Sequence, residues 1–116
     1  MLMEKHMEDL IAAYPDEFLE PGWKLHKRQE HYEGRRIDLI FKDALNRTLL
    51  AELKRGVVTR EHVGQIVEYD GLLKKSGSGT GIELLLIGKN IPHERREFLS
   101  QIGIEVMEIL ITRLRL

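Results

Sequence analysis

Hydrophobic and polar positions alternate along this chain with two periods, and each period predicts its own kind of element. Over residues 3–14 apolar side chains recur at helical spacing, which predicts a helix. Residues 23–32 and 35–42 alternate with a period of two, which is typical of strands. Glu33 and Gly34 lie between them and predict a tight turn. The first part of the chain should therefore be a helix followed by a β-hairpin, with the first strand at a sheet edge.

The rest of the chain switches between strand and helix. The predicted elements are a strand over 48–54 closed by Gly56, a helix to about Lys75 capped by Thr59, an apolar strand over 82–88, a helix from Pro92 to about Ile102, and a last strand or pair of strands over 104–115. The longest helix should bury Val63, Ile66, Val67, Leu72 and Leu73. The order α-β-β-β-α-β-α-β predicts an α/β (mixed α+β) fold: a central mixed sheet with helices on both faces.

Composition restricts the class of protein. A chain of 116 residues with 42% hydrophobic and 32% charged residues suits one globular domain over 1–116. The absence of cysteine excludes disulfides, thiolate nucleophiles and zinc ribbons. Apolar runs are too short to span a bilayer and no signal peptide is evident, so we expect a cytoplasmic protein without membrane contact. Net charge is −1, so nucleic-acid binding would need a local basic patch.

Two acidic residues and a lysine stand in predicted strands, where such residues are depleted. Asp38 lies in the second strand, and Glu52 and Lys54 share a face of the third because strand side chains alternate. The hairpin can bring Asp38 beside Glu52. Two carboxylates about 4 Å apart repel by roughly 4 kcal/mol at an effective dielectric of 20. A proton, Lys54 or a divalent cation must therefore neutralise them.

An all-oxygen site suits Mg²⁺ or Mn²⁺, and Ca²⁺ could also fit. A metal there would activate water, and a lysine would balance the charge developing on a phosphate, as phosphodiester hydrolysis requires. The alternative interpretation is a solvated strand face whose surface ions contribute little to stability.

Two segments resemble a known family: Gly34-Arg35-Arg36-Ile37-Asp38-Leu39-Ile40 and Leu50-Ala51-Glu52-Leu53-Lys54-Arg55-Gly56. They are similar to the PD-(D/E)XK nucleases, with a restriction-endonuclease-like α-β-β-β-α-β core. Together with Glu20-Pro21-Gly22 and the Val63–Tyr69 segment, they resemble the C-terminal nuclease domain of the NucS/EndoMS mismatch endonucleases over about residues 3–110. Ile37, where the superfamily often has proline, is a tolerated departure.

The resemblance implies roles for individual residues. Asp38 and Glu52 would bind Mg²⁺ or Mn²⁺ with the backbone carbonyl of Leu53, and Lys54 would act on the attacking water. Gln65 would help to shape the catalytic centre. Tyr69 lies one helical turn further on and should face the same cleft. The family often uses a glutamate of the first helix, which here is Glu4, with Glu8 as the alternative.

The resemblance implies a divalent-metal-dependent endonuclease that acts on DNA, whether mismatched, branched or otherwise structured. Basic and aromatic residues around the site could contact nucleic acid: Arg35, Arg36, Arg55, Arg60 and Tyr69. A homodimer is expected, because cutting both strands of a duplex needs two sites. The N-terminal DNA-binding domain of these enzymes has no counterpart in this sequence. The chain could be a stand-alone nuclease, a subunit that works with a separate targeting domain or partner protein, or a part of a longer protein. The alternatives are a catalytically inactive nuclease-fold subunit and a binding domain with an accidental motif.

Overall fold

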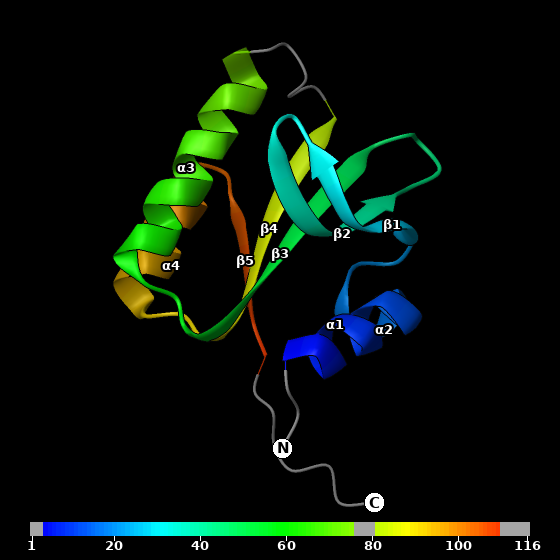
Figure 1. Cartoon of the computed structure of the whole chain (residues 1–116), viewed down its shortest axis with the longest axis horizontal. Coiled ribbons are helices and arrows are strands. Elements are labelled where there is room, and N and C mark those ends of the chain that lie inside the picture. Colours follow the sequence, from blue (N-terminus) through cyan, green and yellow to red (C-terminus); the bar gives the residue numbers. More distant parts are fainter. Residues whose placement is uncertain (1–3, 76–80, 110–116) are drawn as a thin grey trace, which may run out of the picture.

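The computed structural model describes residues 4–75 and 81–109 and shows a twisted sheet with helices on either side (Figure 1). The elements are α1 (Glu4–Ala13), α2 (Pro15–Phe18), β1 (Lys24–Tyr32), β2 (Arg35–Lys42), β3 (Thr48–Val57), α3 (Arg60–Lys75), β4 (Ile82–Asn90), α4 (His93–Gln101) and β5 (Glu105–Glu108). Their order confirms the predicted sequence of elements, except that α2 was not predicted.

The described strands form one five-stranded sheet in the order β1-β2-β3-β4-β5. β1, β2 and β3 are antiparallel neighbours, whereas β3, β4 and β5 run parallel. The parallel pairs need crossover connections, which α3 and α4 supply. The sheet is therefore mixed, as predicted, and β1 lies at its edge.

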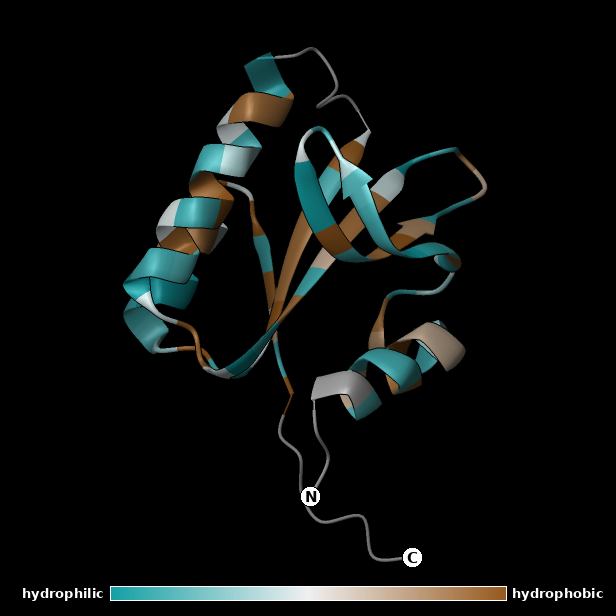
Figure 2. Cartoon of the chain, in the orientation of Figure 1, coloured by the Kyte–Doolittle hydropathy of each residue, from teal (hydrophilic) through white to brown (hydrophobic). Residues whose placement is uncertain are grey.

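Two apolar clusters hold the helices against the sheet, one on each face. The first joins Leu50 and Leu86 of the sheet to Ile66 of α3 and Leu99 of α4. The second cluster packs α1 against the opposite face through Met7, Ile11, Phe41, Leu53 and Ile87. In Figure 2 brown is frequent along the central strands, whereas the β1–β2 hairpin is largely teal and the helices carry both colours. The two clusters confirm helices on both faces of the sheet.

α3 begins with a reciprocal cap. The His62 amide donates to Thr59 Oγ1 at 3.1 Å, and the Thr59 amide donates to His62 Nδ1 at 3.1 Å. The helix then buries Val63, Ile66, Tyr69 and Leu73 at spacings of three and four residues. The prediction for Leu72 was wrong, because this side chain lies off that face and is 58% exposed.

Other element boundaries differ from the predicted ones. Pro15 begins α2, which is possible because the first helical position needs no amide hydrogen. β3 continues beyond Lys54 to Val57, and Gly56 accommodates this with a φ of 71°. The last strand covers only Glu105–Glu108, and the predicted remainder over 110–115 lies outside the described residues. In the part of the chain that the structure describes, no helix is long and apolar enough to cross a membrane.

Candidate active site

Asp38 lies where β2 and β3 separate. Their pairing runs from Lys42 with Thr48 to Leu39 with Ala51, and one further step would set Asp38 opposite Glu52. At this point the Leu53 amide donates to Asp38 Oδ2 at 2.8 Å. The carboxylate thus accepts a hydrogen bond from the backbone of the neighbouring strand, which holds Asp38 at the opening between the two strands.

Glu52 is a buried carboxylate, only 5% exposed, and Arg35 holds it through two hydrogen bonds. Arg35 Nε donates to Oε1 at 2.5 Å and Nη2 donates to Oε2 at 2.8 Å. Lys54 Nζ lies 3.9 Å from Oε2, whereas Leu53 packs on the opposite face against α1. This confirms the predicted shared face of Glu52 and Lys54.

Arg35 supplies the counter-charge that the sequence left open among a proton, Lys54 and a cation. The hydrogen bond to Glu52 raises the pKa of Arg35 above its ordinary value, and the charge of Asp38 adds a smaller effect in the same direction. A paired guanidinium of this kind makes strong, planar contacts with a carboxylate. The charge of Glu52 is thus neutralised by Arg35.

α3 supports Arg35 from the side. Arg35 Nη1 donates to the Gln65 carbonyl at 3.2 Å, and the guanidinium lies 5.5 Å from the centre of the Tyr69 ring. Tyr69 is 3% exposed, and its hydroxyl donates to the Tyr32 carbonyl at 2.5 Å. Burial raises the pKa of Tyr69 to about 12, so the hydroxyl stays protonated as a donor.

A hollow of about 230 Å³ opens beside this arginine. It is lined by Glu33, Gly34, Arg35, Gln65, Glu68, Tyr69 and Leu72. Gln65 and Tyr69 therefore face the same cleft, as predicted. The buried ring of Tyr69 leaves little surface for a ligand to contact.

The first helix reaches Asp38 through Glu8. This carboxylate is 9% exposed and accepts from Arg28 Nη2 at 2.5 Å and from the Gln29 side-chain amide. Gln29 Nε2 also lies 3.3 Å from Asp38 Oδ1. Glu8 is therefore linked to Asp38 through Gln29. The side chain of Glu4 lies outside the described residues, so its role stays a prediction.

Sequence reasoning missed Gln29. Its φ of 50° is left-handed, although it stands within β1, and non-glycine residues in this region cluster at functional sites. The register of the predicted hairpin could have pointed to Gln29. Counting back from the turn, in which Glu33 and Gly34 both have positive φ, sets Gln29 opposite Asp38.

Comparison with known proteins identifies the family. The model of the endonuclease NucS C-terminal domain matches residues 3–113. The chain belongs to this family. No curated protein matches the chain. The match confirms the predicted resemblance.

Solved structures of similar fold cover nearly all of this NucS-family chain. A repair endonuclease from Pyrococcus abyssi has a TM-score of 0.78 and 23% identity, over 94% of this chain and 47% of that one. EndoMS bound to double-stranded DNA has a TM-score of 0.75 and 20% identity, over 97% and 48%. SfsA from Pyrococcus furiosus with Ca²⁺ has a TM-score of 0.55 and 15% identity, over 88% and 53%. The chain spans about half the length of these proteins.

In this NucS-family domain the remaining residues predicted to contact nucleic acid are dispersed around the site. Arg36 is exposed on β2, Arg55 is exposed on β3 beyond Lys54, and Arg60 begins α3. Arg35 is the member of the predicted set that makes the double hydrogen bond to Glu52.

The donors at the NucS-family site suit a hard cation in their chemistry. The carboxylates of Asp38 and Glu52 and the Leu53 carbonyl form an all-oxygen set. Within residues 4–75 and 81–109, no group of three or more His, Cys, Asp or Glu is placed to hold a metal ion. Arg35 donates to both Glu52 oxygens, so a cation would share them with Arg35 or displace it.

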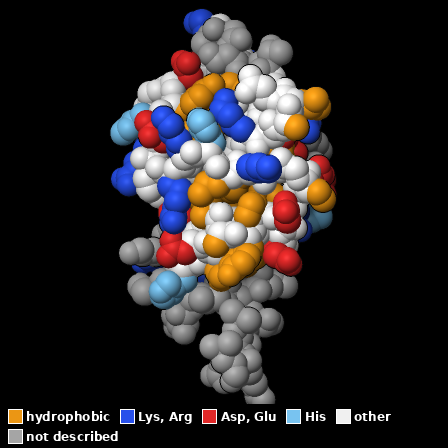
Figure 3. Space-filling model, turned by 90° about the vertical axis from the view of Figure 1, so that its right-hand side faces the viewer, with side chains coloured by type: hydrophobic (Ala, Val, Ile, Leu, Met, Phe, Trp, Pro, Cys, Tyr) orange, Lys and Arg blue, Asp and Glu red, His pale blue; other side chains and the backbone are white. Residues whose placement is uncertain are grey.

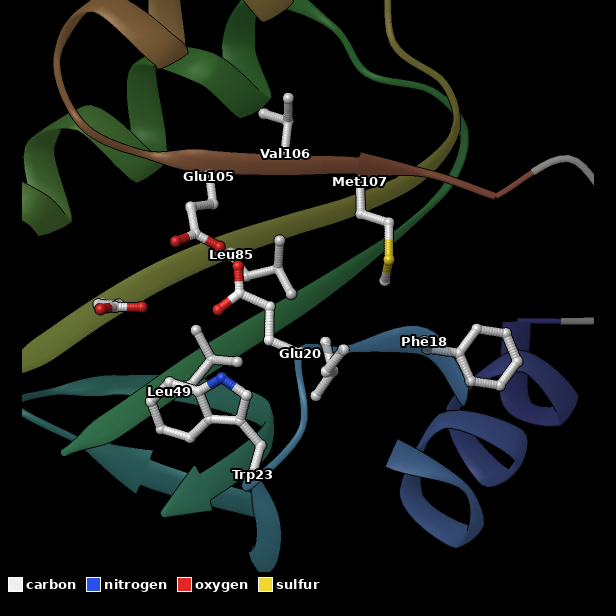
Figure 4. A pocket seen from close by; sticks show the side chains of 10 residues that line it. Phe18, Glu20, Trp23, Leu49, Leu85, Glu105, Val106 and Met107 are labelled. Atoms are coloured by element: carbon white, nitrogen blue, oxygen red, sulfur yellow. The ribbon is translucent and has the colours of Figure 1, made fainter. Parts of the chain in front are cut away.

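A second pocket, of about 200 Å³, opens on the α1 side of the sheet (Figure 4). Glu20 and Glu105 point toward one another across it, beside Trp23 and Met107. Burial raises the pKa of Glu105, and the charges of Glu83 and Glu20 add to this effect. Such an acidic pocket repels an anionic ligand.

Proposed function

We propose that this domain is a divalent-metal-dependent endonuclease of the PD-(D/E)XK type, which hydrolyses phosphodiester bonds in DNA with Mg²⁺ or Mn²⁺. One observation carries the proposal: the Leu53 amide fixes Asp38 at the split between β2 and β3, next to the strand that presents Glu52 and Lys54. Membership of the endonuclease NucS family supports it, as does the EndoMS complex with double-stranded DNA. SfsA, of related fold, has been solved with a divalent cation.

Each residue of the site would have its own role in hydrolysis. Asp38 and Glu52 would hold the cation with the Leu53 carbonyl. The metal would supply an activated water and stabilise charge on the phosphate. Lys54 Nζ, near Glu52, would orient the water and balance negative charge. Gln65 would shape the cleft, while Gln29 would position Asp38 and link it to Glu8.

Arg35 would exchange partners during the reaction. In this structure it neutralises Glu52, and on release its paired N–H groups would face a phosphate of the substrate. The ring of Tyr69 would support the guanidinium in either position. Arg36, Arg55 and Arg60 would bind the backbone of DNA on either side of the cut.

We also propose that the domain forms a homodimer. A homodimer would bring two sites to the two strands of a duplex. Because the chain spans about half of the relatives' length, a separate targeting domain or partner protein would select the DNA structure.

A second candidate is a catalytically inactive nuclease-fold subunit that binds nucleic acid. The double hydrogen bond between Arg35 and Glu52 favours it, because the guanidinium already neutralises the carboxylate that would otherwise hold a metal. Metal binding separates the two candidates, since an inactive subunit needs no cation.

The test is cleavage of a labelled panel with Mg²⁺ or Mn²⁺. The panel contains plain duplex, mismatched duplex, flap, four-way junction, single-stranded DNA and RNA. We expect cutting by the wild type, and a fall of about 100-fold or more in Glu52→Ala and Glu52→Gln, because the charge of this carboxylate is removed. Glu94→Ala, which removes an exposed acid from α4, should cut like the wild type.

Thermal melting with and without Mn²⁺ completes the experiment. The wild type should melt at a higher temperature with Mn²⁺, whereas Glu52→Gln should show no such shift, because it lacks a charged ligand. Turnover retained in Glu52→Gln would contradict the catalytic proposal. Absence of both cutting and an Mn²⁺ shift in the wild type would favour the inactive subunit.

A further inference from the structure

β1 is an edge strand with an unusual set of charges. None of its nine residues is buried, and only β2 pairs with it in the described sheet. It carries Lys24, His26, Lys27, Arg28 and His31 against a single acid, Glu30. Arg28 is occupied by Glu8 and Asp9. Lys24 and Lys27 therefore carry their charges along an exposed edge, with the imidazoles of His26 and His31 beside them.

The register of the hairpin sets two lysines opposite one another. Lys24 pairs with Lys42 near one end of the β1–β2 ladder, and near the other end the imidazole of His31 faces Arg36. Directly opposed like charges destabilise an antiparallel pair. Within the described residues no ion pair is found for Lys24 or Arg36, and Lys42 Nζ donates to the Thr48 hydroxyl at 3.3 Å.

Protection of a sheet edge explains part of this pattern, since lysine on an edge strand discourages pairing with another chain. It does not explain the opposed lysines. A glutamate at position 24 would protect the edge equally well and would attract Lys42. The retained repulsion is what an anionic partner would relieve.

The position of these residues beside Asp38 indicates the kind of anionic partner. Gln29, at the middle of β1, contacts Asp38. Lys27 and His31 lie two residues to either side of it, which is about 7 Å along a strand. Figure 3 shows several Lys, Arg and His side chains on the upper and left parts of the face on the right of Figure 1, around a central hydrophobic area and with acidic side chains between and beside them. Because the net charge is −1, this concentration is local.

We infer that the β1–β2 hairpin presents a cationic ribbon, made of Lys24, His26, Lys27 and His31 of β1 with Arg36 and Lys42 of β2, that binds the sugar–phosphate backbone of a DNA duplex. The inference rests on the proposed function, because the duplex is the one cut beside Asp38. The ribbon positions the duplex without reading its sequence, as backbone contacts do.

The test is binding of a labelled plain duplex by the whole chain in EDTA, measured by fluorescence anisotropy over a series of salt concentrations. Without metal no cutting occurs, so binding is read separately from catalysis. Lys24→Glu and Lys27→Glu should each weaken binding several-fold. The slope of log affinity against log salt should fall by about 0.9 for each phosphate that a variant no longer neutralises.

Stability distinguishes a binding role from a structural one. Lys24→Glu creates an attractive pair with Lys42, so its melting temperature should equal or exceed that of the wild type while its affinity falls. Lys75→Glu makes the same charge change in the last turn of α3 and should leave the salt slope unchanged. It controls for net charge.

Two results would overturn the inference. One is wild-type affinity and salt slope in both Lys24→Glu and Lys27→Glu. The other is absence of duplex binding by the wild type at low salt. Loss of cleavage in Glu52→Gln with full binding would leave the ribbon intact. If the wild type cuts no substrate but a ribbon variant binds the duplex more weakly than the wild type, the ribbon is supported and the catalytic proposal is contradicted.

Discussion

Asp38 and Glu52 are both acidic strand residues, yet the structure neutralises them in different ways. Asp38 accepts from a backbone amide and a glutamine, whereas Glu52 is buried against Arg35. Desolvation makes a buried carboxylate costly unless a partner of opposite charge is held in good geometry. Arg35 precedes Glu52 by 17 residues, so no spacing rule within one strand could point to this pair.

Gln29 offers a residue-scale prediction. Gln29→Ala and Gln29→Gly both remove the amide that links Glu8 to Asp38, so both should lower cleavage by the same factor. Only glycine relieves the left-handed φ of 50°, which costs other residues about 1 kcal/mol. Urea unfolding should therefore show Gln29→Gly to be the more stable variant by about that amount. Equal stability, or cleavage restored by glycine, would contradict this account.

At the scale of elements, α3 begins with a histidine where capping boxes usually have Glu or Gln. His62 Nδ1 accepts from the Thr59 amide only when that nitrogen is unprotonated. Burial lowers the pKa of His62 below its ordinary value of 6.5, and the charge of Lys54 lowers it further. The folded state therefore favours the neutral ring.

This cap makes stability depend on pH. Because the folded pKa of His62 is depressed, its contribution to the free energy of unfolding is complete above pH 6.5 and is lost as pH falls through the folded pKa. His62→Gln keeps a side-chain acceptor without titrating. Between pH 7 and pH 5 the melting temperature of the wild type should fall more than that of His62→Gln. Parallel pH curves would contradict the role of the histidine.

Prediction of elements succeeded where periodicity is local and failed where a neighbouring element sets the limit. The bounds of β2 were predicted correctly, because alternation and the Glu33-Gly34 turn are contained in the hairpin. β3 extends beyond its predicted end at Lys54, because pairing with β4 continues to Val57 opposite Asn90. Leu72 was misplaced because the packing of α3 selected Tyr69 for the buried face.

At the scale of the whole molecule, the proposed homodimer can be tested directly. Two-fold symmetry is the simplest way for a 13.5 kDa chain to present two sites to a duplex. Light scattering at micromolar concentration should give the mass of two chains and, on dilution, a shift toward one. The mass of a single chain at every concentration would contradict the dimer.

The sequence alone determined the order of elements, the β-hairpin, the shared face of Glu52 and Lys54, and the family. These depend on steric periodicity and short motifs, which act within a few residues. Only the tertiary structure decided that Arg35 balances Glu52 and that Gln29 joins Glu8 to Asp38. It also decided that cations oppose one another along the ribbon. Such contacts join segments far apart in the chain, and strand register and helix packing determine which side chains meet.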